Sequence, residues 1–91
     1  MSEPYRTLAF TDTFLTTFAD KQFSASERRA FLQALRLLDE DERPPSLRVH
    51  QLRGDRQGSW SVSASRSLRM TFERLDGGRM RLLTCRRHYD E

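Results

Sequence analysis

The spacing of apolar residues changes once along the chain, at the segment Arg43-Pro44-Pro45. Before this segment apolar residues recur three and four positions apart, which is the spacing of one face of a helix. After it they alternate with polar residues, which is the period of a strand with one buried face. Because proline ends a helix, the change of period coincides with a physical stop. The sequence therefore predicts helices first and strands second, the order of an α+β domain.

The first half is predicted to contain a short strand and two helices. An apolar segment over residues 5–10 predicts the strand, and a first helix is expected from residue 11 or 12 to about residue 21. The segment Ser24-Ala25-Ser26-Glu27 is a capping box, which marks the start of a second helix that ends at the prolines. The last turn, Asp39-Glu40-Asp41-Glu42, puts negative charge at the negative end of the helix dipole. We therefore expect a solvated helix end that frays.

The second half contains four alternating segments separated by turns, and these are predicted to be strands. The strands are expected at residues 47–53, 60–65, 68–73 and 80–85, with a hairpin turn at Asp76-Gly77-Gly78. The helices are expected to cover the apolar side of the sheet, which carries Trp60, Val62, Leu68, Met70 and Phe72. We predict one domain over residues 1–91, in which a short N-terminal strand and a two-helix hairpin pack on a four-stranded, mainly antiparallel, twisted sheet.

Several classes of protein are excluded by what the sequence lacks. No stretch approaches the roughly 18 consecutive apolar residues of a membrane span. The segment Met1-Ser2-Glu3-Pro4 has neither the charged nor the apolar region of a secretory signal. Cys85 is the single cysteine, so an internal disulfide and a Cys-rich zinc site are both excluded, and we expect Cys85 to be a buried strand residue. These absences predict a cytoplasmic protein.

Charge is distributed unevenly between the two halves. Residues 1–42 carry a net charge of −3, whereas residues 43–91 carry +6. Fifteen of the sixteen basic residues are arginine, whose guanidinium group matches phosphate oxygens with two parallel hydrogen bonds. A GC-rich coding sequence would also favour arginine, so composition alone leaves both explanations open. The asymmetry predicts that the second half, and not the first, faces a polyanion.

Three segments of the second half resemble, in order, the RelE/ParE toxin superfamily of type II toxin–antitoxin modules. The first, residues 46–54 (SLRVHQLRG), is similar to an LRxHxLxG segment of these toxins. The second joins residues 58–62 (GSWSV) to residues 67–72 (SLRMTF). The third, residues 85–89 (CRRHY), resembles the CRxHY terminus of YoeB-like toxins. A helix pair before a strand meander is also the family order, and the resemblance is strongest to the YoeB-, YafQ- and HigB-like RNA-cleaving branches.

The resemblance implies a ribosome-dependent endoribonuclease, or mRNA interferase, that works without a metal ion or another cofactor. In such enzymes the RNA 2′-hydroxyl attacks the adjacent phosphate and leaves a 2′,3′-cyclic phosphate or 3′-phosphate and a 5′-hydroxyl end. A base must take the 2′-hydroxyl proton, an acid must protonate the leaving 5′ oxygen, and cations must stabilise the phosphorane. Histidine suits the first two tasks because its pKa lies near the working pH, and arginine suits the third.

The resemblance also assigns roles to single residues. Arg69 matches the arginine that binds the scissile phosphate, His88 the proposed general acid, and Tyr89 the tyrosine beside it. His50 falls where YafQ-like toxins have a histidine and YoeB-like toxins a glutamate base, so it is the candidate base, with a purely structural role as the alternative. Five arginines are predicted to contact RNA phosphates without reading bases, with a solvated surface charge as the alternative for each: Arg48, Arg53, Arg66, Arg86 and Arg87.

The implied partners are a cognate antitoxin and the ribosome with mRNA in its A site. An antitoxin is expected to wrap the domain with a mostly helical, acidic segment, whereas no membrane and no sequence-specific DNA contact is expected. Two alternatives have the same fold: a ParE-like toxin that binds and inhibits DNA gyrase without catalysis, and an inactive relative that serves as a binding module. The availability of His50 and His88 as a base and acid pair favours the nuclease, because pure binding has no need of them.

Overall fold

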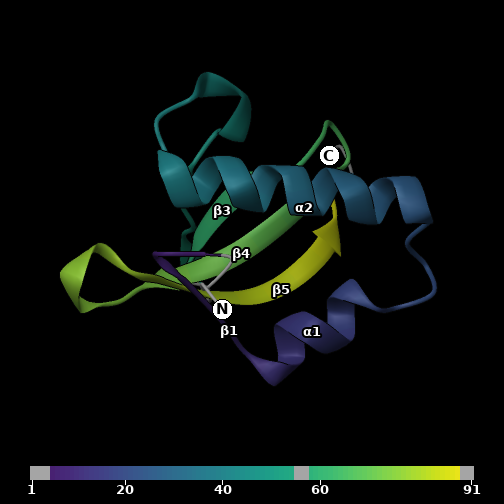
Figure 1. The fold of residues 1–91 in the computed structure, drawn as a ribbon, viewed down its shortest axis with the longest axis horizontal. Coiled ribbons are helices and arrows are strands. Elements are labelled where there is room, and N and C mark those ends of the chain that lie inside the picture. Colours follow the sequence, from purple (N-terminus) through teal and green to yellow (C-terminus); the bar gives the residue numbers. More distant parts are fainter. Residues whose placement is uncertain (1–4, 55–57, 89–91) are drawn as a thin grey trace.

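The computed structural model describes residues 5–54 and 58–88, and over these residues two helices pack on a five-stranded sheet (Figure 1). The elements are β1 (Leu8–Phe10), α1 (Asp12–Phe18), α2 (Ala25–Glu40), the 3-10 helix η1 (Pro45–Leu47), β2 (His50–Gln51), β3 (Trp60–Ser63), β4 (Leu68–Arg74), the 3-10 helix η3 (Asp76–Gly78) and β5 (Met80–Arg87). The strand order is β1-β5-β4-β3-β2. Within the described residues, neither helix has the length and apolar character that crossing a membrane requires.

The predicted α+β class is confirmed, but the sheet has one strand more than predicted. The N-terminal strand β1 joins the sheet as an edge strand parallel to β5, with Leu8 opposite Met80 and Phe10 opposite Leu82. The backbone N–H of Met80 donates to the Thr7 carbonyl at 2.8 Å. The other neighbouring strands are antiparallel, as predicted. The alternation of a three-residue strand does not indicate which edge it will join, which is why the pairing was not predicted.

Both predicted helix starts are confirmed, and each has its expected cap. The Thr11 hydroxyl accepts the N–H of the third residue of α1 at 3.0 Å. At α2 the Ser24 hydroxyl accepts from the Glu27 N–H at 3.1 Å, and the Glu27 carboxylate accepts from the Ser24 N–H at 2.9 Å. α1 ends at Phe18, earlier than the sequence predicts, and the Arg28 guanidinium of α2 donates to the Phe18 carbonyl at 2.9 Å. Part of the end of α1 is thus satisfied by α2 rather than by another helical turn.

The core lies between α2 and the sheet, which α2 crosses over β3 and β4 (Figure 1). The predicted apolar side of the strands is confirmed, because these side chains are buried beneath the helix: Val62, Leu68, Met70, Phe72 and Leu82. Phe31 of α2 is fully buried, and its ring lies 5.0 Å from that of Phe23 and 6.2 Å from that of Phe18. Trp60 is half-buried at the margin of this core.

The strand predicted over residues 47–53 was largely wrong. Only His50–Gln51 forms a strand, because Pro45–Leu47 closes a 3-10 turn and Arg48 adopts left-handed backbone with φ of 47°. Arg48 therefore does not lie with His50 on one face of a strand. The turn expected between this strand and the one that begins at residue 60 lies partly outside the described residues. The hairpin turn at Asp76-Gly77-Gly78 is confirmed, and its two glycines have positive φ.

The acidic end of α2 is bound by other parts of the chain, contrary to the expectation of a fraying, solvated end. The Asp39 carboxylate accepts the N–H groups of Arg6 and Thr7 at 2.9 and 2.7 Å, and so anchors the chain leading into β1. Burial opposes ionisation of Asp39, but the hydrogen bonds from Thr7 and Arg6 outweigh it and hold the pKa below its usual value. Glu42 forms a two-bond ion pair with Arg74 of β4, at 2.6 and 3.0 Å. These contacts offset the unfavourable helix dipole.

Candidate nucleic-acid interface

The face of the sheet that points away from α2 carries small polar side chains and arginines. Cross-strand register arranges them in two rows, because paired residues of antiparallel strands lie on the same face. One row contains His50, Ser61, Thr71 and Thr84, and the next contains Ser63, Arg69 and Arg86. A hydrogen bond of 2.6 Å between the hydroxyls of Thr71 and Thr84 joins two members of the first row. These seven residues are called the open face below.

Arg69 is fixed over the β3–β4 turn. Its Nη1 donates to the carbonyl oxygen of Ser65 at 2.6 Å, of Leu68 at 3.0 Å and of Arg66 at 3.2 Å. The side chain is half-buried, so its position is set by the turn and by the neighbouring strands. A guanidinium that is already ordered loses little conformational entropy when it binds a phosphate. The placement of Arg69 on the side of the sheet opposite Leu68 and Met70 agrees with the alternation in the sequence.

Arg86 of β5 lies directly opposite Arg69 of β4. Among the described residues, no hydrogen bond or ion pair holds the Arg86 guanidinium. Like charges on directly opposed residues of two strands destabilise a sheet, typically by a few tenths of a kcal/mol to about 1 kcal/mol. The opposition of these two charges is therefore unfavourable by itself, and it suits an anion that contacts both guanidinium groups.

His88 continues the ladder between β4 and β5 by one residue. Its backbone N–H donates to the Ser67 carbonyl at 2.7 Å, next to the Leu68–Arg87 pair, and the residue is exposed. Since side chains alternate along a strand, this position belongs to the same face as Arg86. The structure thus places Arg69, Arg86 and His88 at one corner of the open face. Tyr89, the fourth predicted catalytic residue, lies outside the described residues.

His50 lies at the opposite edge of the open face. It is an exposed residue of β2, and its Nδ1 lies 2.8 Å from the Arg48 carbonyl oxygen. Three strand spacings separate β2 from β5, which is about 14 Å across the sheet. His50 is also offset along the strands, because it aligns with Ser61 and Thr71 rather than with Arg69. The structure does not bring His50 into the corner that holds Arg69 and His88.

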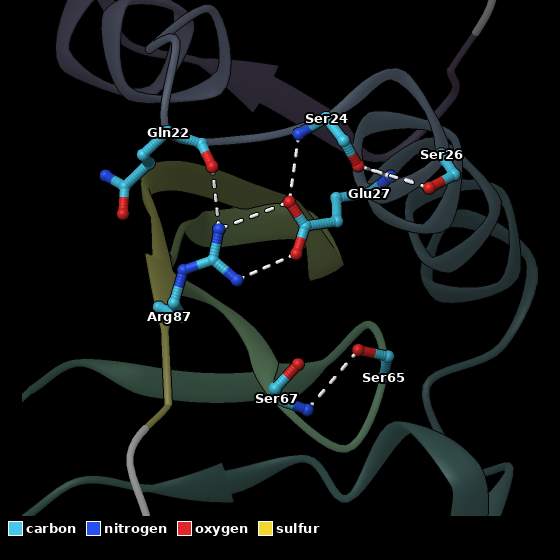
Figure 2. A network of polar contacts seen from close by, with 7 residues as sticks. All are labelled: Gln22, Ser24, Ser26, Glu27, Ser65, Ser67 and Arg87. Atoms are coloured by element: carbon cyan, nitrogen blue, oxygen red, sulfur yellow. Dashed lines mark hydrogen bonds and ion pairs between the residues drawn. The ribbon is translucent and has the colours of Figure 1, made fainter.

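The other predicted RNA-contacting arginines are spread over three places. Arg66 is exposed in the β3–β4 turn beside Arg69, whereas Arg48 and Arg53 are exposed on either side of β2. Arg87 lies on the helix-covered side of the sheet, where its guanidinium is paired with the Glu27 carboxylate at 2.7 and 3.2 Å (Figure 2). Arg66 and Arg86 are therefore the two of the five that the structure places next to Arg69.

A depression of about 500 Å³ borders the open face where α1 meets β5, and the sequence analysis did not identify it. Its lining includes Thr17, Gln22, Thr71, Thr84 and Arg86. The Thr17 hydroxyl accepts the backbone N–H of Cys85 at 2.9 Å and so covers part of the free edge of β5. In β4 the alternation puts Thr71 on the side opposite Met70 and Phe72, but in β5 it groups Thr84 with the buried Met80 and Leu82. The register shift between Thr71 and Phe72 is what brings Thr84 to the open face, and the pattern gave no indication that a helix would come close to it.

The described residues include no group of three or more His, Cys, Asp and Glu side chains that could hold a metal ion. The single cysteine, Cys85, is buried as predicted, and its burial raises the pKa of the thiol to about 12. The thiol is therefore protonated at neutral pH and is a poor nucleophile.

The fold and the open face together define a small α+β protein with a basic sheet surface, and solved structures of the same fold are known. No protein family profile and no curated protein matches the sequence. A YoeB/ParE toxin from Agrobacterium tumefaciens has a TM-score of 0.71 and 20% identity, with 92% of this chain and 100% of that chain covered. For the RelBE2 toxin–antitoxin complex from Mycobacterium tuberculosis the TM-score is 0.72 and the sequence identity is 18%. The match covers 94% of this chain and 100% of that chain. For YafQ from E. coli the TM-score is 0.63 and the sequence identity is 15%, and the match covers 88% of this chain and 90% of that chain.

These likenesses extend over almost the whole of each chain. The described protein therefore has the fold of the RelE/ParE toxin superfamily, as the sequence motifs predicted. At this level of identity the likeness establishes the fold, and the chemistry has to be argued from the residues of the open face.

Proposed function

We propose that this protein is the toxin of a type II toxin–antitoxin module and cleaves mRNA on the ribosome as an endoribonuclease. The observation that carries the proposal is the corner of the open face where Arg69 and Arg86 oppose each other beside His88. Two opposed guanidinium groups provide positive charge for a phosphate, and an exposed imidazole next to them provides a proton donor. Solved structures with this fold include RelE-, YoeB- and YafQ-type toxins, which supports the toxin role.

The proposed reaction uses these groups in a single displacement at phosphorus. The RNA 2′-oxygen forms a bond to the adjacent phosphorus as it loses its proton to a base, and the bond from phosphorus to the 5′ oxygen breaks. Arg69 and Arg86 stabilise the additional negative charge of the phosphorane, and His88 donates a proton to the leaving 5′ oxygen. The products are a 2′,3′-cyclic phosphate and a 5′-hydroxyl end. No step requires an oxidant, a reductant or a co-reactant other than RNA.

The base of the reaction is less well defined by the geometry than the acid. His50 remains the predicted base, although it lies across the sheet from His88. A nucleotide that spans the open face would have to lie along the row from His50 to Thr84 for this imidazole to take part. We therefore expect substitution of His50 to affect cleavage less than substitution of Arg69 or His88.

A cognate antitoxin is the proposed protein partner. Solved structures with this fold include toxin–antitoxin complexes, among them RelBE2 from Mycobacterium tuberculosis and DinJ–YafQ from E. coli. A partner that covers the open face would have to present carboxylates to Arg69 and Arg86, so an acidic segment suits this surface best.

Incubation of programmed ribosomes with the protein tests the proposal directly. We expect the wild-type protein to produce cut mRNA with 5′-hydroxyl ends. Arg69→Ala and His88→Ala should each lower cleavage by at least about tenfold, and His50→Ala should lower cleavage by a smaller factor. Circular dichroism should show each variant to be folded. Normal cleavage by both the Arg69 and the His88 variant would contradict the assigned site. Absence of cleavage together with DNA breaks that depend on gyrase would instead identify the ParE-like alternative.

A further inference from the structure

Arg87 stands between two residues of the proposed site but points to the other side of the sheet. Arg86 belongs to the open face and His88 follows on the same side of the sheet, whereas Arg87 reaches toward the start of α2 (Figure 2). Its Nη1 lies 2.7 Å from Oε2 of Glu27, and its Nη2 donates to Oε1 of Glu27 at 3.2 Å and to the Gln22 carbonyl at 2.7 Å. Three bonds thus tie the last residue of β5 to the α1–α2 connection and to α2.

The partner of Arg87 is itself fixed, so the anchor is rigid at both ends. Glu27 is the last residue of the capping box and the third of α2, and its Oε1 also accepts the Ser24 N–H at 2.9 Å (Figure 2). The Arg87 guanidinium lies 5.3 Å from the centre of the Phe23 ring, which is buried. Each side chain of this ion pair is 26% exposed, compared with 39% and 35% for Arg74 and Glu42 at the other end of α2.

We propose that Glu27 and Arg87 form a positioning pair that fixes the pleat at the end of β5 and thereby aims Arg86 and His88 at the RNA. Successive side chains of a strand point to opposite faces, so fixing Arg87 to the helix side fixes its two neighbours to the open side. The inference rests on the proposed function for its role in cleavage, but the geometric part stands on the contacts alone.

The β3–β4 turn holds the other side of the same segment. The Ser67 carbonyl accepts the His88 N–H at 2.7 Å, and the Ser65 carbonyl accepts Nη1 of Arg69 at 2.6 Å. The Ser67 N–H lies 3.4 Å from the Ser65 hydroxyl within the turn (Figure 2). The β3–β4 turn therefore holds both the Arg69 guanidinium and the backbone of His88, while the Glu27–Arg87 pair sets the side of the sheet toward which His88 points.

Two substitutions each remove the ion pair, and the one at Arg87 also removes the bond to the Gln22 carbonyl. Arg87→Met keeps an aliphatic chain over Phe23 and loses the guanidinium. Glu27→Gln keeps an acceptor for the capping box and loses the charge. Glu42→Gln is the matched control, because it breaks an ion pair of the same kind at the far end of α2. Single-turnover cleavage on ribosomes then separates the maximal rate from the half-saturating concentration.

We expect Arg87→Met to lower the maximal rate about tenfold, Glu27→Gln to lower it by roughly threefold or more, and half-saturation to change less than about twofold. The double variant should cleave about as slowly as Arg87→Met, because the two residues act as one unit. Glu42→Gln should cleave at the wild-type rate. A wild-type maximal rate for Arg87→Met, a change confined to half-saturation, or an equal loss with Glu42→Gln would each overturn the proposal.

Hydrogen exchange gives a readout that does not need activity. We expect the His88 amide to exchange at least about tenfold faster in Arg87→Met and Glu27→Gln than in the wild type, while the amides of Met70 and Leu82 keep their protection. Unchanged exchange at His88 in both variants would overturn the positioning role. If the wild-type protein does not cleave mRNA, the proposed function fails, and the exchange measurement alone decides whether the pair positions His88.

Discussion

The two faces of the sheet differ in how they arrange charge, although each carries an ion pair: on the side away from α2, Arg81 of β5 pairs with Glu73 of β4 at 2.8 Å. On the helix-covered side the charged groups at the margin of the core are paired: Arg87 with Glu27, and Arg74 with Glu42. On the open face Arg69 opposes Arg86, and among the described residues the Arg86 guanidinium has no carboxylate against it. We expect the first arrangement to contribute modestly to stability and the second to cost some, and we propose the second as the place where an anion binds.

The comparison explains why two adjacent arginines have different roles. Arg86 and Arg87 differ by one position, and the pleat sends them to opposite faces. A run of basic residues in a strand is therefore not a single patch, and only alternate members can contact one ligand. We therefore infer a binding role for Arg86 and a positioning role for Arg87.

The largest effect is expected from a core substitution on the helix-covered side of the sheet. Phe31→Ala removes a fully buried ring that packs between Phe18 and Phe23, and we expect the free energy of unfolding to fall by about 3–5 kcal/mol. Urea denaturation monitored by circular dichroism measures this loss. Arg86→Gln on the open face is the comparison, and it should leave stability unchanged or slightly raised because it removes an opposed like charge. A loss of less than about 1 kcal/mol with Phe31→Ala would contradict the assigned core.

A second prediction sharpens the role of the open face. Arg86→Gln should weaken binding of a cleavage-resistant single-stranded RNA, and it should reduce the slope of log K against log salt concentration by about 0.7, the value for one phosphate contact. Fluorescence anisotropy at several salt concentrations measures both quantities. Arg79→Gln is the matched control, since Arg79 is an exposed arginine at the β4–β5 hairpin, away from the proposed site. Equal slopes for the wild type and Arg86→Gln would show that Arg86 does not contact RNA phosphate.

Much of the fold follows from local patterns, and the exceptions have a common cause. The capping box at Ser24 and Glu27, the hairpin at Asp76-Gly77-Gly78 and the apolar side of β3 and β4 were all predicted from spacing. The placement of β1, the shortness of β2 and the bound acidic end of α2 were not. Each of these depends on a partner distant in sequence, such as Asp39 with the amides of Arg6 and Thr7, and periodicity carries no information about such partners.

The same distinction applies to the candidate site. Alternation in β4 put Arg69 on the side of the sheet away from the core, and the structure agrees. It could not show that Arg86 would be the residue opposite Arg69, because register between strands depends on the intervening turn and on the bulge between Thr71 and Phe72. It also could not separate Arg87 from Arg86 without knowing that Glu27 lies above the end of β5. The sequence could pair His50 and His88 as base and acid, but strand order places β2, which carries His50, three strands away from β5, after which His88 follows.

The smallest expected effect concerns the pH dependence of the covered face. Hydrogen bonds from the Arg87 side chain and the Ser24 amide lower the pKa of Glu27 from 4.5 to about 2. A carboxylate whose pKa is lower in the folded protein stabilises the fold above its unfolded pKa, and this contribution is lost as the pH falls toward the folded value. The difference in free energy of unfolding between wild type and Glu27→Gln should therefore be full at pH 7 and shrink between about pH 4.5 and pH 2. Urea denaturation at pH 7, 4 and 2.5 measures it, with Glu42→Gln as the control for a more exposed pair. A difference that stays constant over this range would mean that the Glu27 charge does not act through Arg87.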